Sequence, residues 1–347
     1  MKTLLIFLCL LINHALSSPV FGSNNVQLDG SFGHKNHGLD KLGTLNSAKT
    51  LTLTIVTGSL ANTQLVASYY KSVQGLTIFD QTDMHLQMKG SVTLLSTVFN
   101  TNFIEYKCSN LTTQQTCYAS SSEVSIPAAL KSAIIGILGL EQVLTLKPNS
   151  VVGKEIKLNS GGLTAQATTY SYFTPTQVAQ VYGFPSSTGA GVRVGIVSLG
   201  GYFTQADLQA YFNTFGYGTA PTVKIVYVDG ASMNFADVKS ALENYLDVEI
   251  IASVVPKASI TLYFAPNTWQ GFYDVLKTAL QNNDVVSLSW GASESATSSY
   301  WNVFQTLFAT YANVPIFIAT GDLGSTGGVG FPASCPNAIG TYLFYAV

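Results

Sequence analysis

Apolar residues in the second half of the chain form short runs that alternate with longer stretches of helical spacing. Short apolar runs are typical of strands buried on both faces, and the longer stretches are typical of helices with one apolar side. Strand and helix in alternation predict a parallel sheet covered by helices on both faces. The expected strands are 192–197, 223–228, 260–264, 285–289 and 315–319, and the expected helices are 204–215, 237–255, 269–281 and 300–313.

The pattern before residue 146 is different and mixes alternating stretches with helical ones. Residues 51–56 alternate as a half-buried strand does, and residues 126–140 are expected to form a helix with Pro127 in its first turn. Such a mixture predicts an α+β domain. The polar, Gly- and Ser-containing stretch 147–168 that follows has the composition of an exposed, cleavable linker.

The N-terminus has the features of a secretory signal. Lys2 is basic, residues 4–12 are apolar, and Ala15-Leu16-Ser17 is a small-x-small cleavage site. We therefore divide the chain into a signal peptide, a front α+β domain, a linker and an α/β domain. The expected bounds are 1–18, 19–146, 147–172 and 173–347.

Composition narrows the environment in which the protein works. Charged residues are 10% of the chain, against about 25% in ordinary globular proteins, and the net charge is −2. This balance gives no sign of a nucleic-acid or membrane partner. A small number of carboxylates suits a protein that works in acid, because few carboxylates are then available whose protonation could unfold it. A secreted surface rich in uncharged polar residues explains the composition equally well.

Cysteine usage agrees with an oxidising compartment. Cys108 and Cys117 enclose a short loop that holds Asn110, the acceptor of an N-glycosylation sequon, and we expect them to form a disulfide. Cys9 falls in the signal peptide. Cys335 is then left over, which suggests a partner beyond the end of this sequence.

The α/β domain must do any acid–base chemistry with carboxylates, because the chain has no histidine after residue 85. This excludes a Ser-His-Asp triad and a histidine-ligated zinc centre in that domain. Glu243 and Asp247 are four residues apart on one predicted helix and share a face with Ile250 and Val254. Such a pair should have shifted pKa values, as general acid–base catalysis requires. An acidic helix start with only a structural role is the alternative.

A third carboxylate follows a predicted strand in a Gly-rich loop. Asp322 lies within residues 319–328, which lack the lysine of a phosphate loop. A simple turn explains such a loop as well as a site does.

Taken together, these segments resemble the sedolisins, a family of subtilisin-folded peptidases that includes physarolisin and tripeptidyl-peptidases. The resemblance covers residues from about 30 to 335, and the front part resembles the family's pro-kumamolisin activation propeptide. The segments that carry it are Glu243–Glu249, Ala258–Asn267, Ser287–Gly291, Gly321–Ser325 and Phe331–Ser334.

The resemblance implies a role for each matching residue. Glu243 would be the general base for a serine nucleophile, Asp247 would orient Glu243, and a protonated Asp322 would stabilise the oxyanion. The backbone of Ser289, Trp290 and Gly291 would pair with a peptide or protein substrate, and the propeptide would be an intramolecular inhibitor. The location implied is secreted or lysosomal/endosomal.

The family's Gly-Thr-Ser-Ala-x-x-Pro nucleophile segment and its calcium site are not found in these 347 residues. The expected fold is therefore an incomplete subtilisin-like α/β domain behind an α+β propeptide. We expect calcium to be bound only by the complete family member, with no metal site in this chain. Two hypotheses follow: an acid endopeptidase precursor that is inactive as this fragment, or a non-catalytic decoy that binds peptides or a peptidase.

Overall fold

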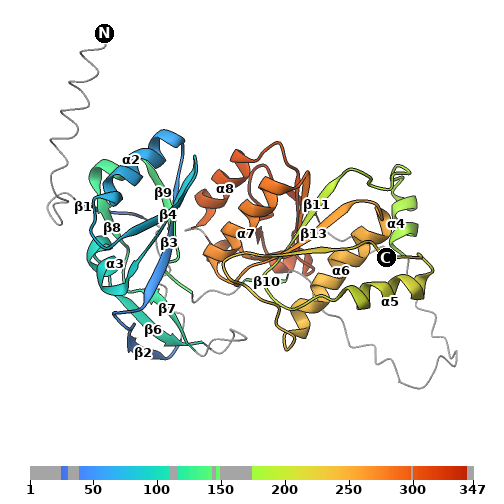
Figure 1. The fold of residues 1–347 in the computed structure, drawn as a ribbon, viewed down its shortest axis with the longest axis horizontal. Helices are drawn as coiled ribbons and strands as arrows, with labels where there is room; N and C mark the ends of the chain where they lie inside the picture. The colour runs from blue at the N-terminus through green and yellow to red at the C-terminus, as the bar shows by residue number, and fades with distance from the viewer. Residues whose placement is uncertain are drawn as a thin grey trace, which may run out of the picture. The chain divides into compact units, whose positions relative to one another are not determined.

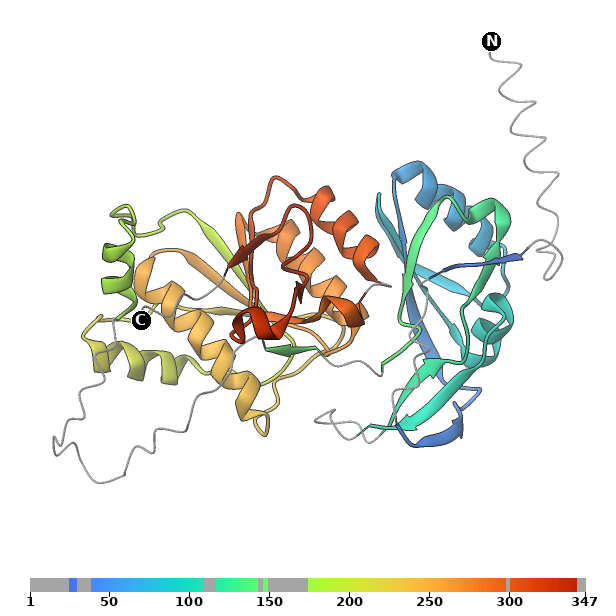
Figure 2. The same ribbon diagram turned by 180° about the vertical axis from the view of Figure 1, so that it is seen from behind.

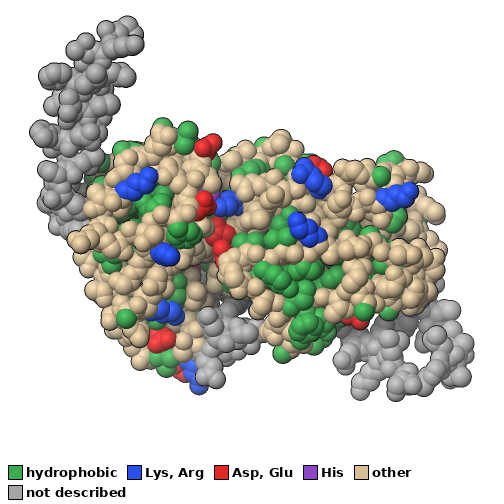
Figure 3. Space-filling model, in the orientation of Figure 1, with side chains coloured by type: hydrophobic (Ala, Val, Ile, Leu, Met, Phe, Trp, Pro, Cys, Tyr) green, Lys and Arg blue, Asp and Glu red, His purple; other side chains and the backbone are tan. Residues whose placement is uncertain are grey.

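The computed structural model describes residues 25–29, 39–108, 116–142, 146–148, 174–297 and 300–341. It divides into two compact units, which Figures 1 and 2 show from opposite sides. The first unit contains the residues up to 145, with 268–270 and 298–306, and the second contains most of the remainder. On the face drawn in Figure 3, charged side chains are few and uncharged atoms cover most of the surface.

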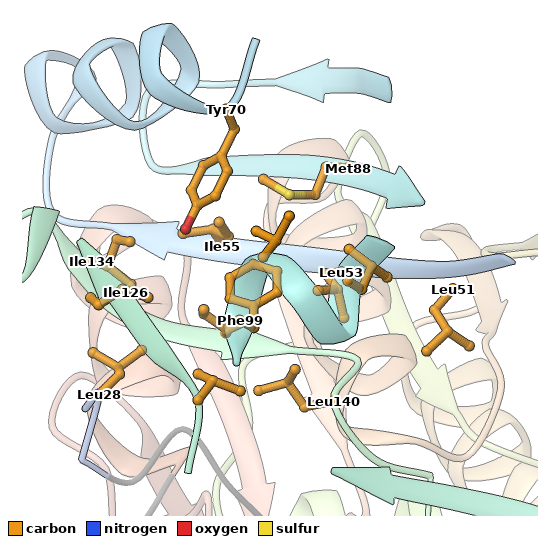
Figure 4. Packing of buried hydrophobic residues seen from close by; sticks show 14 of the residues in the cluster. Leu28, Leu51, Leu53, Ile55, Tyr70, Met88, Phe99, Ile126, Ile134 and Leu140 are labelled. Carbon is orange, nitrogen blue, oxygen red and sulfur yellow. The ribbon is translucent and has the colours of Figure 1, made fainter. Parts of the chain in front are cut away.

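The first unit is built on an antiparallel sheet with strand order β4-β5-β3-β9. Leu53, Ile55, Tyr70 and Phe99 belong to its fully buried core (Figure 4). Serine side chains cap both helices, Ser59 at α2 and Ser91 at α3. The elements are β1 (Asn25–Gln27), β2 (Lys41–Thr44), β3 (Thr50–Thr57), α2 (Leu60–Lys71), β4 (Thr77–Gln81), β5 (His85–Ser91), α3 (Val92–Phe99), β6 (Phe103–Lys107) and β7 (Thr116–Ser120).

The prediction of a helix over residues 126–140 is wrong. The structure has β8 (Ser125–Pro127), a short 3₁₀ turn (Ala128–Leu130) and β9 (Ile134–Leu138) there. β9 pairs antiparallel with β3 and lies almost wholly buried. β-branched isoleucines favour a strand, and a short apolar run does not distinguish a buried strand from a buried helix.

The second unit holds a six-stranded sheet of order β12-β13-β11-β14-β16-β18 in which every neighbouring pair is parallel. β11 is central, and the chain moves from one side of it at β13 to the other at β14. Ligands of open parallel sheets bind outside the carboxyl ends of strands at such a switch point. The strands are β11 (Arg193–Ser198), β12 (Lys224–Tyr227), β13 (Ser259–Phe264), β14 (Val285–Leu288), β16 (Ile316–Ala319) and β18 (Ile339–Thr341).

Helices cover both faces of this sheet. On one face, Leu208 and Phe212 of α5 and Val248 of α6 pack against Ile196 and Leu262 of the strands. On the other, Asn283 at the end of α7 donates to the Tyr263 hydroxyl at 2.9 Å. The parallel α/β fold is thus confirmed. The helices of this unit are α4 (Pro175–Val181), α5 (Gln205–Phe215), α6 (Val238–Val254) and most of α7 (Trp269–Asn282). The division into units falls within α8 (Trp301–Thr310).

Helix ends follow the local sequence. Thr174 and Gln177 form the capping box of α4, with Pro175 at its start. Thr204 caps α5, and Gly216 ends it in the left-handed conformation that glycine adopts without strain. None of the helices in the described ranges has the length and apolar character that crossing a membrane requires.

Candidate active site

The acidic pair is held by α6, which covers the sheet next to the central strand. The Asp237 side chain accepts from the Ser240 N–H at 3.2 Å and so starts the helix. Ala241 and Val248 bury the sheet-facing side. Glu243, one turn before Asp247, is only 5% exposed, and Asp247 is half-buried. The helix therefore presents both carboxyls in a partly desolvated setting, whereas Ile250 of the predicted stripe is exposed.

A glycine loop fixes α6 against the carboxyl end of β11. The Asn244 amide donates to the Gly200 carbonyl at 3.0 Å and to the Tyr202 carbonyl at 3.3 Å. Gly201 has a φ of +72°, and a Cβ there would lie 2.3 Å from the Ala241 nitrogen. Only glycine allows this approach, so the loop sets the position of the acids at the edge of the sheet.

Ser289 connects the pair to the loop after β14. Its hydroxyl donates to Asp247 Oδ1 at 2.8 Å across 42 residues of sequence. Since β14 neighbours the central strand β11, this contact lies at the carboxyl edge of the sheet, beside the switch point. Two predicted site residues from different elements are therefore brought into contact.

Burial and charge change the acidity of Asp247. Burial, followed by the nearby Glu243 charge, raises the pKa of Asp247 to about 7, and the Ser289 hydrogen bond opposes the shift. A carboxyl with this pKa keeps its proton in acid and can share it with a neighbouring carboxylate. The pair can therefore hold and move one proton near Ser289.

Asp322 lies beyond β16, the strand next to β14. Gly321 before it has a φ of +101°, and the Asp322 side chain is half-buried. Leu288 of β14 is in register with Ile318 of β16. Ser289 and Asp322 thus follow adjacent parallel strands and emerge at the same edge of the sheet.

The third predicted segment, Ser289–Gly291, leads into β15 (Trp290–Ser293), the middle strand of a small antiparallel sheet. One neighbour is β17 (Gly330–Phe331). The other is β10 (Lys147–Pro148), which pairs Lys147 with Gly291 and Pro148 with Trp290. A segment of the chain itself therefore occupies the edge at which the resemblance puts a peptide.

Asn267 makes a contact beside β10 that the sequence reasoning did not anticipate. Its side-chain oxygen accepts from the Leu146 N–H, and its amide donates to the Leu146 carbonyl, both at 2.8 Å. The available signal was its position, because it lies three residues after the end of β13 in the Ala258–Asn267 segment. Position alone does not show what the side chain binds.

The expected disulfide between Cys108 and Cys117 is present, and Cys335 is buried with a free thiol. Asn110, the predicted signal peptide and the predicted linker after Pro148 lie outside the described residues. Within the part of the chain that the structure describes, no three His, Cys, Asp or Glu residues gather to hold a metal. Calcium binding by the complete family member stays a prediction.

Comparison with known proteins gives matches to both units. The Pro-kumamolisin activation domain family matches residues 55–143. Kumamolisin of Bacillus sp. (strain MN-32) is 32% identical over 236 residues, covering 62% of this chain and 42% of that protein. Sedolisin of Pseudomonas sp. (strain 101) is 25% identical over 284 residues, covering 74% of this chain and 47% of that protein.

A solved structure of Pseudomonas sedolisin, a serine-carboxyl proteinase complexed with two molecules of pseudo-iodotyrostatin, matches with a TM-score of 0.41 and 24% identity. That match covers 48% of this chain and 52% of the other. The chain spans less than half the length of the kumamolisin and sedolisin sequences that it matches. On the sequence matches, the chain is similar to peptidases of the sedolisin family, and residues 55–143 match the Pro-kumamolisin activation domain family.

Proposed function

We propose that this protein is the precursor of a secreted acid endopeptidase that hydrolyses peptide bonds by serine-carboxyl chemistry. The observation that carries the proposal is the contact of Ser289 with Asp247 beside the buried Glu243. It puts a proton-holding acid pair at the edge of the sheet where the peptide-pairing strand begins. Secretion, or delivery to lysosomes or endosomes, rests on the signal peptide proposed at 1–18.

Each acid has a distinct task in the proposed reaction. Glu243 takes the proton of the serine hydroxyl as it attacks the scissile carbonyl. Asp247 holds Glu243 in position and shares its proton. Asp322 in its neutral form donates a hydrogen bond to the developing oxyanion. Because this mechanism uses carboxyl groups both as the base and as a hydrogen-bond donor, acid is the proposed working range.

The activation domain has the role of an intramolecular inhibitor in this proposal. Its support is β10, which follows the family match at residues 55–143, because Lys147–Pro148 pairs with an edge of β15 as an added antiparallel strand. A peptide substrate needs that same edge. Removal of the segment is therefore expected to precede turnover.

We infer that residues 1–347 alone do not hydrolyse peptides, because the sequence has no Gly-Thr-Ser segment to supply the nucleophile. The second hypothesis is a decoy that binds peptides or a peptidase without cutting. Sequencing the transcript beyond the codon for Val347 distinguishes the two, since a Gly-Thr-Ser reading frame is expected for the peptidase.

Two proteins test the catalytic roles: the 347-residue chain and the same chain extended by a family-type C-terminal segment. We expect only the extended chain to cleave denatured casein in acid, with Glu243→Gln or Asp322→Asn reducing kcat at least about 100-fold. Glu249→Gln, on the same helix, is the matched control and should retain activity. If the 347-residue chain cleaves casein and loses this activity on Glu243→Gln, the predicted inactivity of the chain is wrong. If the extended chain keeps full activity with Glu243→Gln, the proposed mechanism is wrong.

A further inference from the structure

α6 carries a second apolar side that faces away from the sheet. One side of the helix is buried with the strands through Val248 and Ala252, and Figure 2 shows the helix lying along the outside of the sheet. The opposite side has an outer stripe of four apolar residues at four-residue spacing: Val238, Leu242, Leu246 and Ile250, which are 54%, 45%, 49% and 49% exposed. A helix that is apolar on both sides is normally covered on both, so the outer stripe needs a partner.

Two oppositely charged residues flank the outer stripe. Lys239 is exposed and Glu249 is half-buried. Because successive residues turn by about 100°, these two lie on opposite sides of the stripe. Within the described part of the chain, neither takes part in a salt bridge. Burial, followed by the charge of Asp207, raises the pKa of Glu249 to about 7, so a cation beside this carboxyl would stabilise it.

We propose that the outer stripe is a self-association surface, at which α6 packs antiparallel against α6 of a second copy of this chain. Side chains four residues apart share one face of a helix and form a continuous ridge, here about 18 Å long. Pairing of two such ridges about a two-fold axis sets Val238 opposite Ile250 and Leu242 opposite Leu246. The surface is therefore complementary to itself, as a two-fold interface requires.

The flanking charges favour this antiparallel register. A two-fold axis brings opposite flanks of the two helices together, so Lys239 of each copy lies opposite Glu249 of the other. In a parallel pair the two residues would be about 15 Å apart along the helix axis. Four half-exposed side chains supply less area than the roughly 800 Å² per partner of a standard interface. We therefore expect a weak dimer that dissociates at micromolar concentrations.

Sedimentation equilibrium of the 347-residue chain tests the surface. At pH 8, where Glu249 is charged, the mass should rise from one copy to two over micromolar concentrations. Leu246→Glu should raise the dimer Kd about 10-fold or more, because it puts a charge into the outer stripe. Leu65→Glu on α2 is the matched control, since Leu65 is also 49% exposed, and it should leave Kd unchanged.

Both variants change exposed side chains, so unchanged urea unfolding midpoints should show that they fold. A chain that is monomeric at every concentration overturns the proposal. A Leu246→Glu dimer as tight as the parent dimer overturns it too.

Charge reversal tests the register. Lys239→Glu alone and Glu249→Lys alone should each raise Kd about 3-fold or more, because each sets like charges opposite one another at two points. The double variant should return to the parent Kd, since both pairs form again with reversed sign. A double variant as weak as the single ones overturns the antiparallel pairing. The outer stripe would then be assigned to another occupant, such as the family-type C-terminal segment of the extended chain.

Discussion

Asp247 is a predicted site residue whose acidity depends strongly on its environment, since burial and Glu243 raise its pKa to about 7. An unfolded aspartate titrates near 4, so between about pH 4 and pH 7 the folded state binds the extra proton. Stability must then fall as the pH rises through this window, by up to about 1.4 kcal/mol for each pH unit.

We predict that urea unfolding midpoints of the chain fall from pH 4 to pH 7 and that Asp247→Asn flattens the slope. Asp284→Asn is the control: Arg193 lowers the pKa of Asp284 to about 2, so its effect appears only below about pH 4. An unchanged slope in Asp247→Asn would refute the assignment.

Among the elements, the contact between α6 and the loop after β11 decides where the acids lie. Gly201 and Gly216 have nearly the same positive φ, +72° and +71°, but only Gly201 lacks room for a Cβ. We predict that Gly216→Ala costs about 1 kcal/mol of unfolding free energy, the strain of the left-handed backbone alone. Gly201→Ala should cost at least about 2 kcal/mol more, because the loop must move away from the Ala241 nitrogen. Urea unfolding of the two variants is the measurement, and equal losses would show that the close approach does not hold the helix.

For the whole molecule, the polar stretch that follows Pro148 is the expected site of processing. We predict that limited proteolysis cuts first between 149 and 172, a polar stretch rich in Gly, Ser and Thr, and leaves a front fragment that keeps the Cys108–Cys117 bridge. Leu146 and Lys147 should resist cleavage, because both are paired within the second unit. Mass spectrometry of the first fragments is the readout. First cuts within 192–319 would show that the α/β unit is not a finished fold.

Much of the α/β unit follows from the sequence alone. The alternation of strands and helices, the caps at Thr174 and Thr204, and the one-turn spacing of Glu243 and Asp247 depend on residues within a few positions of each other. Periodicity and capping are local effects, so they can be predicted before any tertiary contact is known.

Tertiary structure decided the remainder. Residues 134–138 form a strand because β3 pairs with them, although their apolar run also fits a buried helix. The raised pKa of Asp247 needs burial and Glu243 together, and its bond to Ser289 spans 42 residues. Asn267 and Leu146 meet across 121 residues. The sequence therefore determined which groups could react, and long-range packing determined which of them meet, because burial and pairing across a fold have no local signature.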